Sequence, residues 1–192
     1  MPFSFDDFNE FYKETIQFIQ PKTILDVGPG AGKHGILTKN TLPSSIIDCV
    51  EPTSSYLEQY KLNDLYNSIY QTDIKTYINE NPRKTYDMVI FGDILEHLFR
   101  SEVFDVLDFF SYRSEWIFVA WPINLRQDDW EGNKYEVHKS NFTISEISNL
   151  FEVVYYRKYD KGKYFNIPEH RTIFSYNACL LKGYYTQKMY QW

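Results

Sequence analysis

The sequence contains few cysteines, no long apolar run and no excess of positive charge. Only two of its 192 residues are cysteine, Cys49 and Cys179, and both lie in apolar segments, so we expect buried free thiols rather than a disulfide framework. No apolar run approaches the roughly 20 residues that span a membrane, and the acidic N-terminus lacks the apolar core of a signal peptide. The formal net charge of −6 argues against sequence-independent binding to nucleic acid, which requires a basic face. We therefore expect a soluble cytoplasmic protein, either a monomer or a homodimer.

Apolar segments with strand character alternate with segments of helical periodicity along the chain. The predicted strands cover residues 23–27, 45–52, 68–74, 85–91, 115–122, 152–159 and 172–183. The predicted helices cover residues 5–19, 31–42, 54–63, 101–112 and 143–151. This alternation predicts an α/β fold with a doubly wound, mostly parallel, seven-stranded sheet and helices on both faces. The last two strands have no helix between them, which predicts an antiparallel hairpin at the edge of the sheet, and the first helix is an N-terminal addition.

Glycine is also scarce, and half of the eight glycines lie in one short segment, "VGPGAGKHG", at the end of the first predicted strand. A phosphate-binding loop needs a glycine five residues before Gly32-Lys33 and a hydroxyl residue after them, but Val27 and His34 stand there. The dinucleotide fingerprint fits these glycines only if two residues separate the strand from the motif. An NAD-binding turn is therefore a weak match. We expect His34 to cover a bound cofactor or to face solvent.

A carboxylate precedes the glycines. Asp26 stands at the end of the strand, where its negative charge favours a sulfonium or amine over a pyrophosphate, and the glycines permit close approach of a ligand to the backbone. The pattern Asp-x-Gly-x-Gly-x-Gly, which begins at Asp26, resembles motif I of class I S-adenosylmethionine-dependent methyltransferases. The resemblance extends over residues 22–120, where further motifs of the family follow in the expected order.

The resemblance implies a set of residues that bind S-adenosylmethionine. Glu51 ends the second strand, where a carboxylate can accept hydrogen bonds from both ribose hydroxyls. In this family an acidic residue at the end of the third strand, here Asp73, faces the adenine amine. The segment "YDMVIFGDILEHL" resembles the fourth strand of the family and the loop that follows it. The implied cofactor-binding residues are Asp26, Gly28, Gly30, Gly32, Glu51, Asp73, Ile74 and Asp93.

Class I methyltransferases place the acceptor above the carboxyl ends of strands four and five, so the resemblance implies His138, His97 and Asp93 as catalytic candidates. The spacing of Asp93, Glu96 and His97 predicts one shared face of a helical turn. Together with His138, these residues are compatible with Mg²⁺, Mn²⁺ or Zn²⁺, and the set is similar to that of the small-RNA 3′-terminal 2′-O-methyltransferases. Many metal-free relatives also carry Leu-Glu-His here, so a metal-free site is our interpretation and the metal site is the alternative.

Residues 121–141 form a connection that is longer than most and rich in tryptophan and polar residues, which predicts an acceptor-binding segment. Tryptophan rings can stack on a sugar or base, and arginine can pair with an acidic group. The candidate acceptor-binding residues are Trp121, Arg126, Trp130 and Asn133, with His170 and Arg171 as weaker candidates from a later polar insert.

We therefore expect one methyltransferase domain over residues 1–192, with an N-terminal helix in 1–20, a cofactor-binding half in 22–120 and a substrate-facing half in 121–192. The expected reaction is methyl transfer from S-adenosylmethionine to an oxygen of a small-molecule or saccharide-like acceptor, with nitrogen as the less favoured atom. The first alternative is a metal-assisted RNA ribose 2′-O-methyltransferase. The second is an NAD-linked oxidoreductase or a non-catalytic cofactor-binding module.

Overall fold

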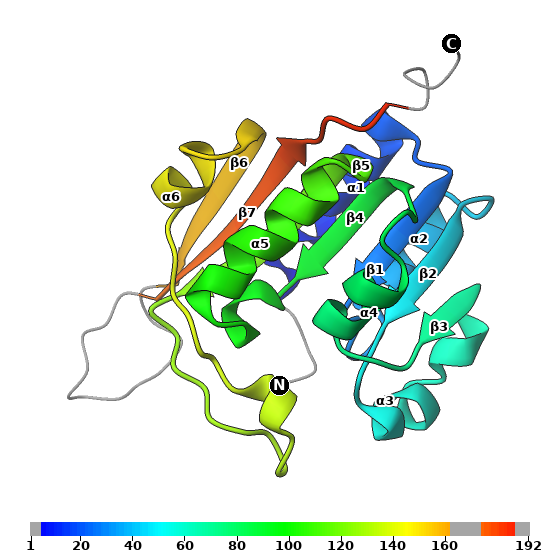
Figure 1. The fold of residues 1–192 in the computed structure, drawn as a ribbon, viewed down its shortest axis with the longest axis horizontal. Coiled ribbons are helices and arrows are strands. Elements are labelled where there is room, and N and C mark those ends of the chain that lie inside the picture. Colours follow the sequence, from blue (N-terminus) through cyan, green and yellow to red (C-terminus); the bar gives the residue numbers. More distant parts are fainter. Residues whose placement is uncertain (1–4, 162–173, 187–192) are drawn as a thin grey trace.

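The computed structural model describes residues 5–161 and 174–186, which form a central sheet with helices on both faces (Figure 1). The strands are β1 (Thr23–Val27), β2 (Ile46–Val50), β3 (Ser68–Tyr70), β4 (Tyr86–Gly92), β5 (Ser114–Ile123), β6 (Glu152–Lys161) and β7 (Phe174–Lys182). The helices are α1 (Asn9–Ile19), α2 (Lys33–Thr41), α3 (Ser54–Gln59), α4 (Ile74–Glu80), α5 (Arg100–Ser111) and α6 (Ile144–Ser148). The short 3₁₀ turns are η1 (Asp6–Phe8), η2 (Leu62–Asp64), η3 (Leu95–His97) and η4 (Lys134–Glu136).

The sheet has seven strands in the order β3-β2-β1-β4-β5-β7-β6. Strand β7 runs antiparallel to both of its neighbours, whereas the other paired strands are parallel. The predicted doubly wound sheet with an antiparallel edge hairpin is therefore confirmed. The strand order reverses beside β1, where β2 lies on one side and β4 on the other, and ligands of such sheets bind at this position.

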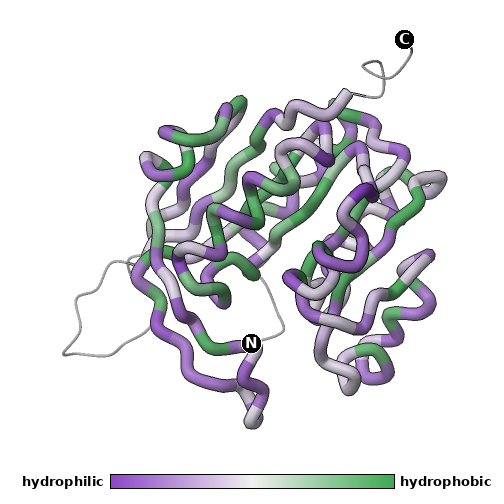
Figure 2. The backbone as a smooth tube through the Cα atoms, in the orientation of Figure 1, coloured by the Kyte–Doolittle hydropathy of each residue, from purple (hydrophilic) through white to green (hydrophobic). Residues whose placement is uncertain are grey.

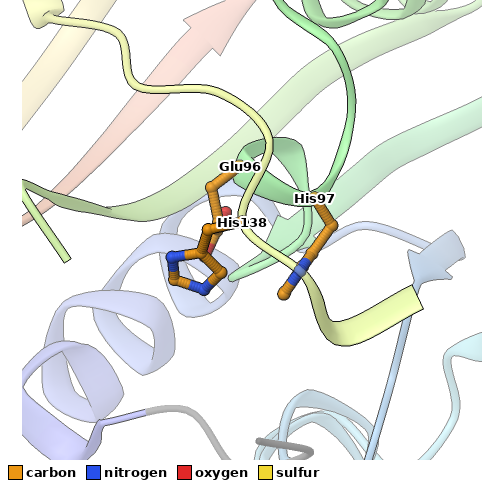
Figure 3. Close-up of side chains that lie close together, drawn as sticks. All are labelled: Glu96, His97 and His138. Carbon is orange, nitrogen blue, oxygen red and sulfur yellow. The ribbon is translucent and has the colours of Figure 1, made fainter. Parts of the chain in front are cut away.

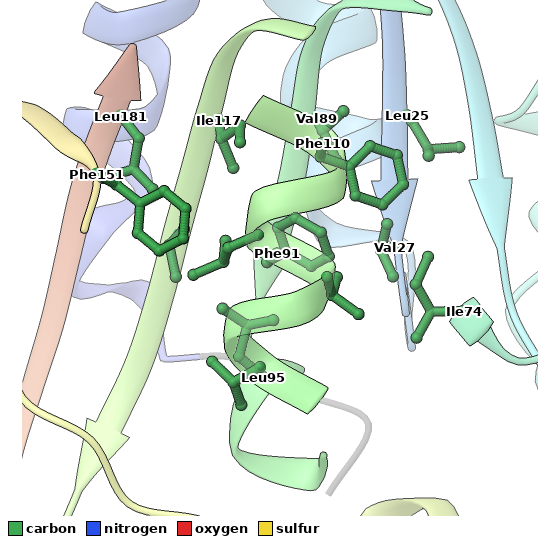
Figure 4. Packing of buried hydrophobic residues seen from close by; sticks show 14 of the residues in the cluster. Leu25, Val27, Ile74, Val89, Phe91, Leu95, Phe110, Ile117, Phe151 and Leu181 are labelled. Carbon is green, nitrogen blue, oxygen red and sulfur yellow. The ribbon is translucent and has the colours of Figure 1, made fainter. Parts of the chain in front are cut away.

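The two faces of the sheet bury separate hydrophobic clusters. Successive residues of a strand point to opposite faces, so Leu25 lies in one cluster and Ile24 in the other. Helices α4, α5 and α6 cover the first face, where Phe110 of α5 packs against Phe91 with 5.7 Å between ring centroids (Figure 4). Helix α1 covers the second face. Figure 2 shows hydrophobic residues along the inner strands and α5, whereas the segment between β5 and α6 is largely hydrophilic.

Helix α4 is not predicted from the sequence, which extends the third strand to residue 74. In the structure β3 ends at Tyr70, and Asp73 caps α4 by accepting hydrogen bonds from the backbone N–H groups of Lys75 and Thr76 at 3.0 and 3.1 Å. An Asp at this position is itself a signal for a helix start. The helix has only seven residues, which is too short for a clear helical period to show in the sequence.

The N-terminal helix and the two cysteines are also predicted from the sequence. The N-terminal helix begins at Asn9 after the η1 turn, later than predicted. Both cysteines are buried free thiols, as expected. Within the described part of the chain, no helix combines the length and apolar character that crossing a membrane requires.

Candidate functional site

A bare stretch of backbone lies at the carboxyl end of β1. Gly28, Gly30 and Gly32 have φ values of +65°, +51° and +78°, a left-handed conformation that glycine adopts without steric cost. A Cβ atom at Gly28 would overlap the side chain of Ile94, which follows β4. The turn is therefore packed closely against the loop after β4, and Gly28 is required both by its conformation and by the space available. The structure brings the three predicted glycines together in this turn.

Two buried carboxylates border the glycine turn. Asp26 of β1 is 1% exposed and accepts a hydrogen bond from the Tyr66 hydroxyl at 2.6 Å, whereas its Oδ1 has no hydrogen-bond partner among the described residues. Glu51 follows β2, is 3% exposed and accepts hydrogen bonds from the backbone N–H groups of Thr53, at 2.8 Å, and Gly30. Burial raises the pKa of Asp26 and the pKa of Glu51 to about 7 each. A cation or a hydrogen-bond donor beside either group would favour its ionised form.

Asp73 and Ile74 lie at the start of α4. The Asp73 carboxylate accepts hydrogen bonds from two backbone N–H groups and, at 2.9 Å, from the Thr76 hydroxyl. Ile74 is 6% exposed and packs in the cluster beneath α4 and α5. Their role in cofactor binding stays a prediction, and the structure gives both a role in building α4.

Three of the predicted site residues meet above the end of β4. Glu96 and His97 come from η3 and His138 from the loop between β5 and α6, and their ligand atoms all lie within 4.8 Å of one another (Figure 3). Glu96 is 2% exposed, and its Oε2 has no hydrogen-bond partner in the described structure. Burial lowers the pKa of His97 to about 4 and also lowers the pKa of His138. Both imidazoles are therefore neutral at pH 7.

Asp93 does not share a helical face with Glu96 and His97, which corrects the expectation from their spacing. Its backbone has a φ of +56°, so the chain turns sharply between β4 and η3. Its carboxylate accepts a hydrogen bond from the hydroxyl of Tyr176 in β7. The predicted set of four thus divides into a cluster of three and a separate Asp93–Tyr176 pair. No motif in the sequence marks Tyr176, because its position follows from the pairing of β5 with β7.

The long loop places its predicted residues in different environments. Trp121 is fully buried, stacks on Phe142 with 5.3 Å between ring centroids, and donates its indole N–H to the Phe142 carbonyl at 3.0 Å. This corrects the prediction that Trp121 stacks on an acceptor, because the ring belongs to the core. Trp130 is 38% exposed and Arg126 is exposed, so both side chains are accessible to a ligand. His170 and Arg171 lie outside the described residues.

Hydrogen bonds also join the loop between β5 and α6 to the start of α3. The Asn133 amide donates hydrogen bonds to the hydroxyls of Thr53 at 3.1 Å and Tyr56 at 3.2 Å, and Tyr56 donates to Glu136 at 3.0 Å. Asn133 therefore connects the loop to α3, close to Glu51. Sequence reasoning misses Tyr56 and Glu136, since neither stands in a recognisable motif.

His34 is buried at 8% exposure and does not face solvent, which corrects that part of the expectation. Its ring packs against Tyr12 and Phe118 with centroid distances of 4.8 and 6.0 Å. A Cβ at Gly92 would overlap the imidazole, so the two residues fit together in the core. Burial lowers the pKa of His34 to about 3, and the ring is neutral.

No family model and no curated protein matches this sequence. Solved structures do match. The N-terminal domain of EvdMO1 with SAH bound has a TM-score of 0.64 at 12% identity, covering 94% of this chain and 82% of that one. The plantazolicin methyltransferase BpumL in complex with SAH has a TM-score of 0.59 at 15% identity, covering 91% and 82%. Coclaurine N-methyltransferase bound to N-methylheliamine and SAH has a TM-score of 0.65 at 15% identity, covering 91% and 72%. The described chain has the fold of class I S-adenosylmethionine-dependent methyltransferases.

Proposed function

We propose that this protein transfers a methyl group from S-adenosylmethionine to an oxygen atom of a small-molecule or saccharide-like acceptor. The observation that carries the proposal is the glycine turn at the point where the strand order reverses, bordered by the buried carboxylates of Asp26 and Glu51.

The residues around the turn fit the donor. The backbone at Gly30 carries no side chain and permits close approach of a ligand, and the buried Asp26 has an oxygen without a hydrogen-bond partner in the described structure. Glu51 would accept the hydrogen bonds of ribose hydroxyls, and the two carboxylates favour a ligand with positive charge. When bound, S-adenosylmethionine supplies an electrophilic methyl group on a positively charged sulfur.

Groups that can accept a proton lie after β4 and in the loop between β5 and α6, where the acceptor would bind. A hydroxyl acceptor must lose its proton as its oxygen attacks, and a base within hydrogen-bond reach assists that step. Asp93, held by Tyr176, and the neutral imidazoles of His97 and His138 are the groups that would accept the proton. Alignment of the acceptor oxygen with the methyl group in a site closed to water would supply much of the remaining rate enhancement.

A small acceptor is supported by the loop and by the neighbours. The loop between β5 and α6 is hydrogen-bonded to α3 through Asn133, and a loop held in this way would favour a small acceptor over a large one. The similar structures include a plantazolicin methyltransferase, coclaurine N-methyltransferase, and the EvdMO1 domain in the presence of SAH and D-fucose. The net charge of −6 disfavours a polyanionic acceptor.

Calorimetric titration with S-adenosylhomocysteine tests the donor site. We expect micromolar affinity, on the order of −8 kcal/mol. Glu51→Gln should weaken binding by about 1–3 kcal/mol, because an NH₂ group, which cannot accept a hydrogen bond, replaces one of the two buried carboxylate oxygens. Glu58→Gln, on the exposed side of α3, is the matched control and should bind as the unmodified protein does. NAD is the ligand control. If the folded protein binds no thioether, or binds NAD instead, the proposal is wrong.

A further inference from the structure

We propose that Glu96, His97 and His138 bind one divalent transition-metal ion. The three side chains offer one carboxylate and two imidazoles, and their ligand atoms lie within 4.8 Å of one another. Neighbouring ligands of one ion at about 2.1 Å lie roughly 3 to 3.5 Å apart, so small side-chain rotations complete the site. The first observation behind this inference is therefore convergence of the three groups from two separate segments (Figure 3).

The second observation is the orientation of the two imidazoles. Nδ1 of His97 lies 3.2 Å from the Val137 carbonyl, and Nδ1 of His138 lies 2.9 Å from the Leu125 carbonyl. A carbonyl oxygen can only accept, so each Nδ1 must carry the proton. Each neutral ring then keeps a lone pair on Nε2. A backbone carbonyl that fixes the tautomer in this way is the usual partner of a metal-ligating histidine.

The third observation is the unsatisfied carboxylate. Glu96 is 2% exposed, and its Oε2 has no hydrogen-bond partner among the described residues. A buried polar atom without a partner costs free energy, and a cation between Glu96 and the two histidines would remove that cost. An Asp93 ligand is not needed, because its carboxylate is already held by Tyr176.

The backbone holds the loop ligand beside the other two. The Glu96 carbonyl accepts hydrogen bonds from the N–H groups of Lys139 at 2.8 Å and Ser140 at 3.1 Å, and His138 N–H donates to the Gln127 carbonyl at 3.0 Å. These bonds fix the segment around His138 against η3 without any ion. The ligands are therefore positioned in advance, which lowers the cost of binding.

Two imidazoles and one carboxylate suit Zn²⁺, Mn²⁺, Co²⁺ or Fe²⁺ better than Ca²⁺ or Mg²⁺, which prefer oxygen ligands. Three protein ligands leave coordination positions open for an acceptor oxygen. Such an ion would lower the pKa of an acceptor hydroxyl, and with both histidines engaged, Asp93 would remain to accept the proton. This role rests on the proposed methyl transfer, whereas the site itself does not.

Cobalt binding tests the site without an activity assay. Protein stripped with EDTA and then dialysed is titrated with Co²⁺, followed by the visible absorption of the bound ion and by calorimetry. We expect one equivalent to bind. His138→Ala and Glu96→Gln should each weaken binding at least about tenfold, because each removes a ligand. Tyr135→Ala, an exposed residue of the same loop, is the matched control and should leave binding unchanged. Circular dichroism confirms that each variant is folded.

The proposal is overturned if the folded protein binds no Co²⁺, or if Glu96→Gln and His138→Ala bind it as tightly as the unmodified protein. A parallel titration with S-adenosylhomocysteine on the EDTA-treated protein keeps the two proposals apart. Cobalt binding without thioether binding would retain the metal site and reject the methyltransferase proposal. Thioether binding without cobalt binding would reject the metal site and leave the methyltransferase proposal standing.

Discussion

The free energy of unfolding of the ligand-free protein should fall as the pH rises from 6.5 to 8. Burial raises the pKa of Asp26 from 3.8, and the pKa of Glu51 from 4.5, to about 7 in the folded protein. In the unfolded chain both groups are ionised throughout this range, so the folded state holds the extra protons. Stability is then lost as the pH rises through the folded pKa values.

The size of the effect follows from those pKa values. For one carboxyl with a pKa of about 7 in the folded protein that is fully ionised in the unfolded chain, the free energy of unfolding falls by ~0.8 kcal/mol between pH 6.5 and 8. Two such carboxyls lower it by ~1.6 kcal/mol. The buried histidines act with the opposite sign. The folded pKa values of His34 and His97 are about 3 and about 4, so each residue adds ~0.4 kcal/mol of stability between pH 6.5 and 8, as its unfolded counterpart with a pKa of 6.5 loses the rest of its proton. The two histidines therefore offset about half of the loss from the two carboxylates, and a net loss of ~0.8 kcal/mol remains.

Urea denaturation followed by tryptophan fluorescence at pH 6.5 and 8 measures the difference. Asp26→Asn, which keeps an oxygen for the Tyr66 hydroxyl, should remove ~0.8 kcal/mol of the loss of stability between the two pH values. Glu58→Gln should leave it unchanged, because that side chain is exposed. An unaltered pH dependence in Asp26→Asn would refute the reasoning about the buried carboxylates.

Three further outcomes are expected. Gly28→Ala should destabilise the protein by about 1–3 kcal/mol and weaken thioether binding, because φ is +65° and the new methyl group overlaps Ile94; unchanged thermal stability would contradict this. Trp121→Ala should lower the free energy of unfolding by about 3–5 kcal/mol in urea titrations, since it leaves a cavity beside Phe142, and a loss below 1 kcal/mol would argue against the burial. Asn133→Ala should speed proteolysis within residues 124–141 while the global unfolding midpoint changes little, and an unchanged cleavage rate would mean that its hydrogen bonds do not hold the loop.

The sheet and the glycine turn could be predicted because both leave local patterns in the sequence. Strands covered on both faces appear as continuous apolar runs, and a turn that needs left-handed conformations appears as clustered glycines. Alternation along β5 also contains information that the prediction did not use. Trp121 is in phase with Ile117 and Val119, which lie in the cluster beneath α5, so its burial follows from the strand period.

The arrangement of the acidic and histidine residues could be predicted only in part. Spacing placed Glu96 and His97 together, and they do lie together in η3. Spacing could not show that Asp93 turns toward Tyr176, because that contact joins residues 83 positions apart and depends on the order of strands in the sheet. For the same reason, the hydrogen bonds from Asn133 to Thr53 and Tyr56 could not be predicted from the sequence.

The loop between β5 and α6 has a consequence for the timing of the proposed reaction. It contacts Thr53 and Tyr56, beside the proposed donor site, through Asn133, and it contacts η3 through the N–H groups that donate to the Glu96 carbonyl. Entry of the donor and departure of the methylated product then depend on the same segment. The rate at which this loop opens would therefore set an upper limit on the turnover rate. A variant that loosens the loop would release product faster while it binds both the donor and the acceptor more weakly.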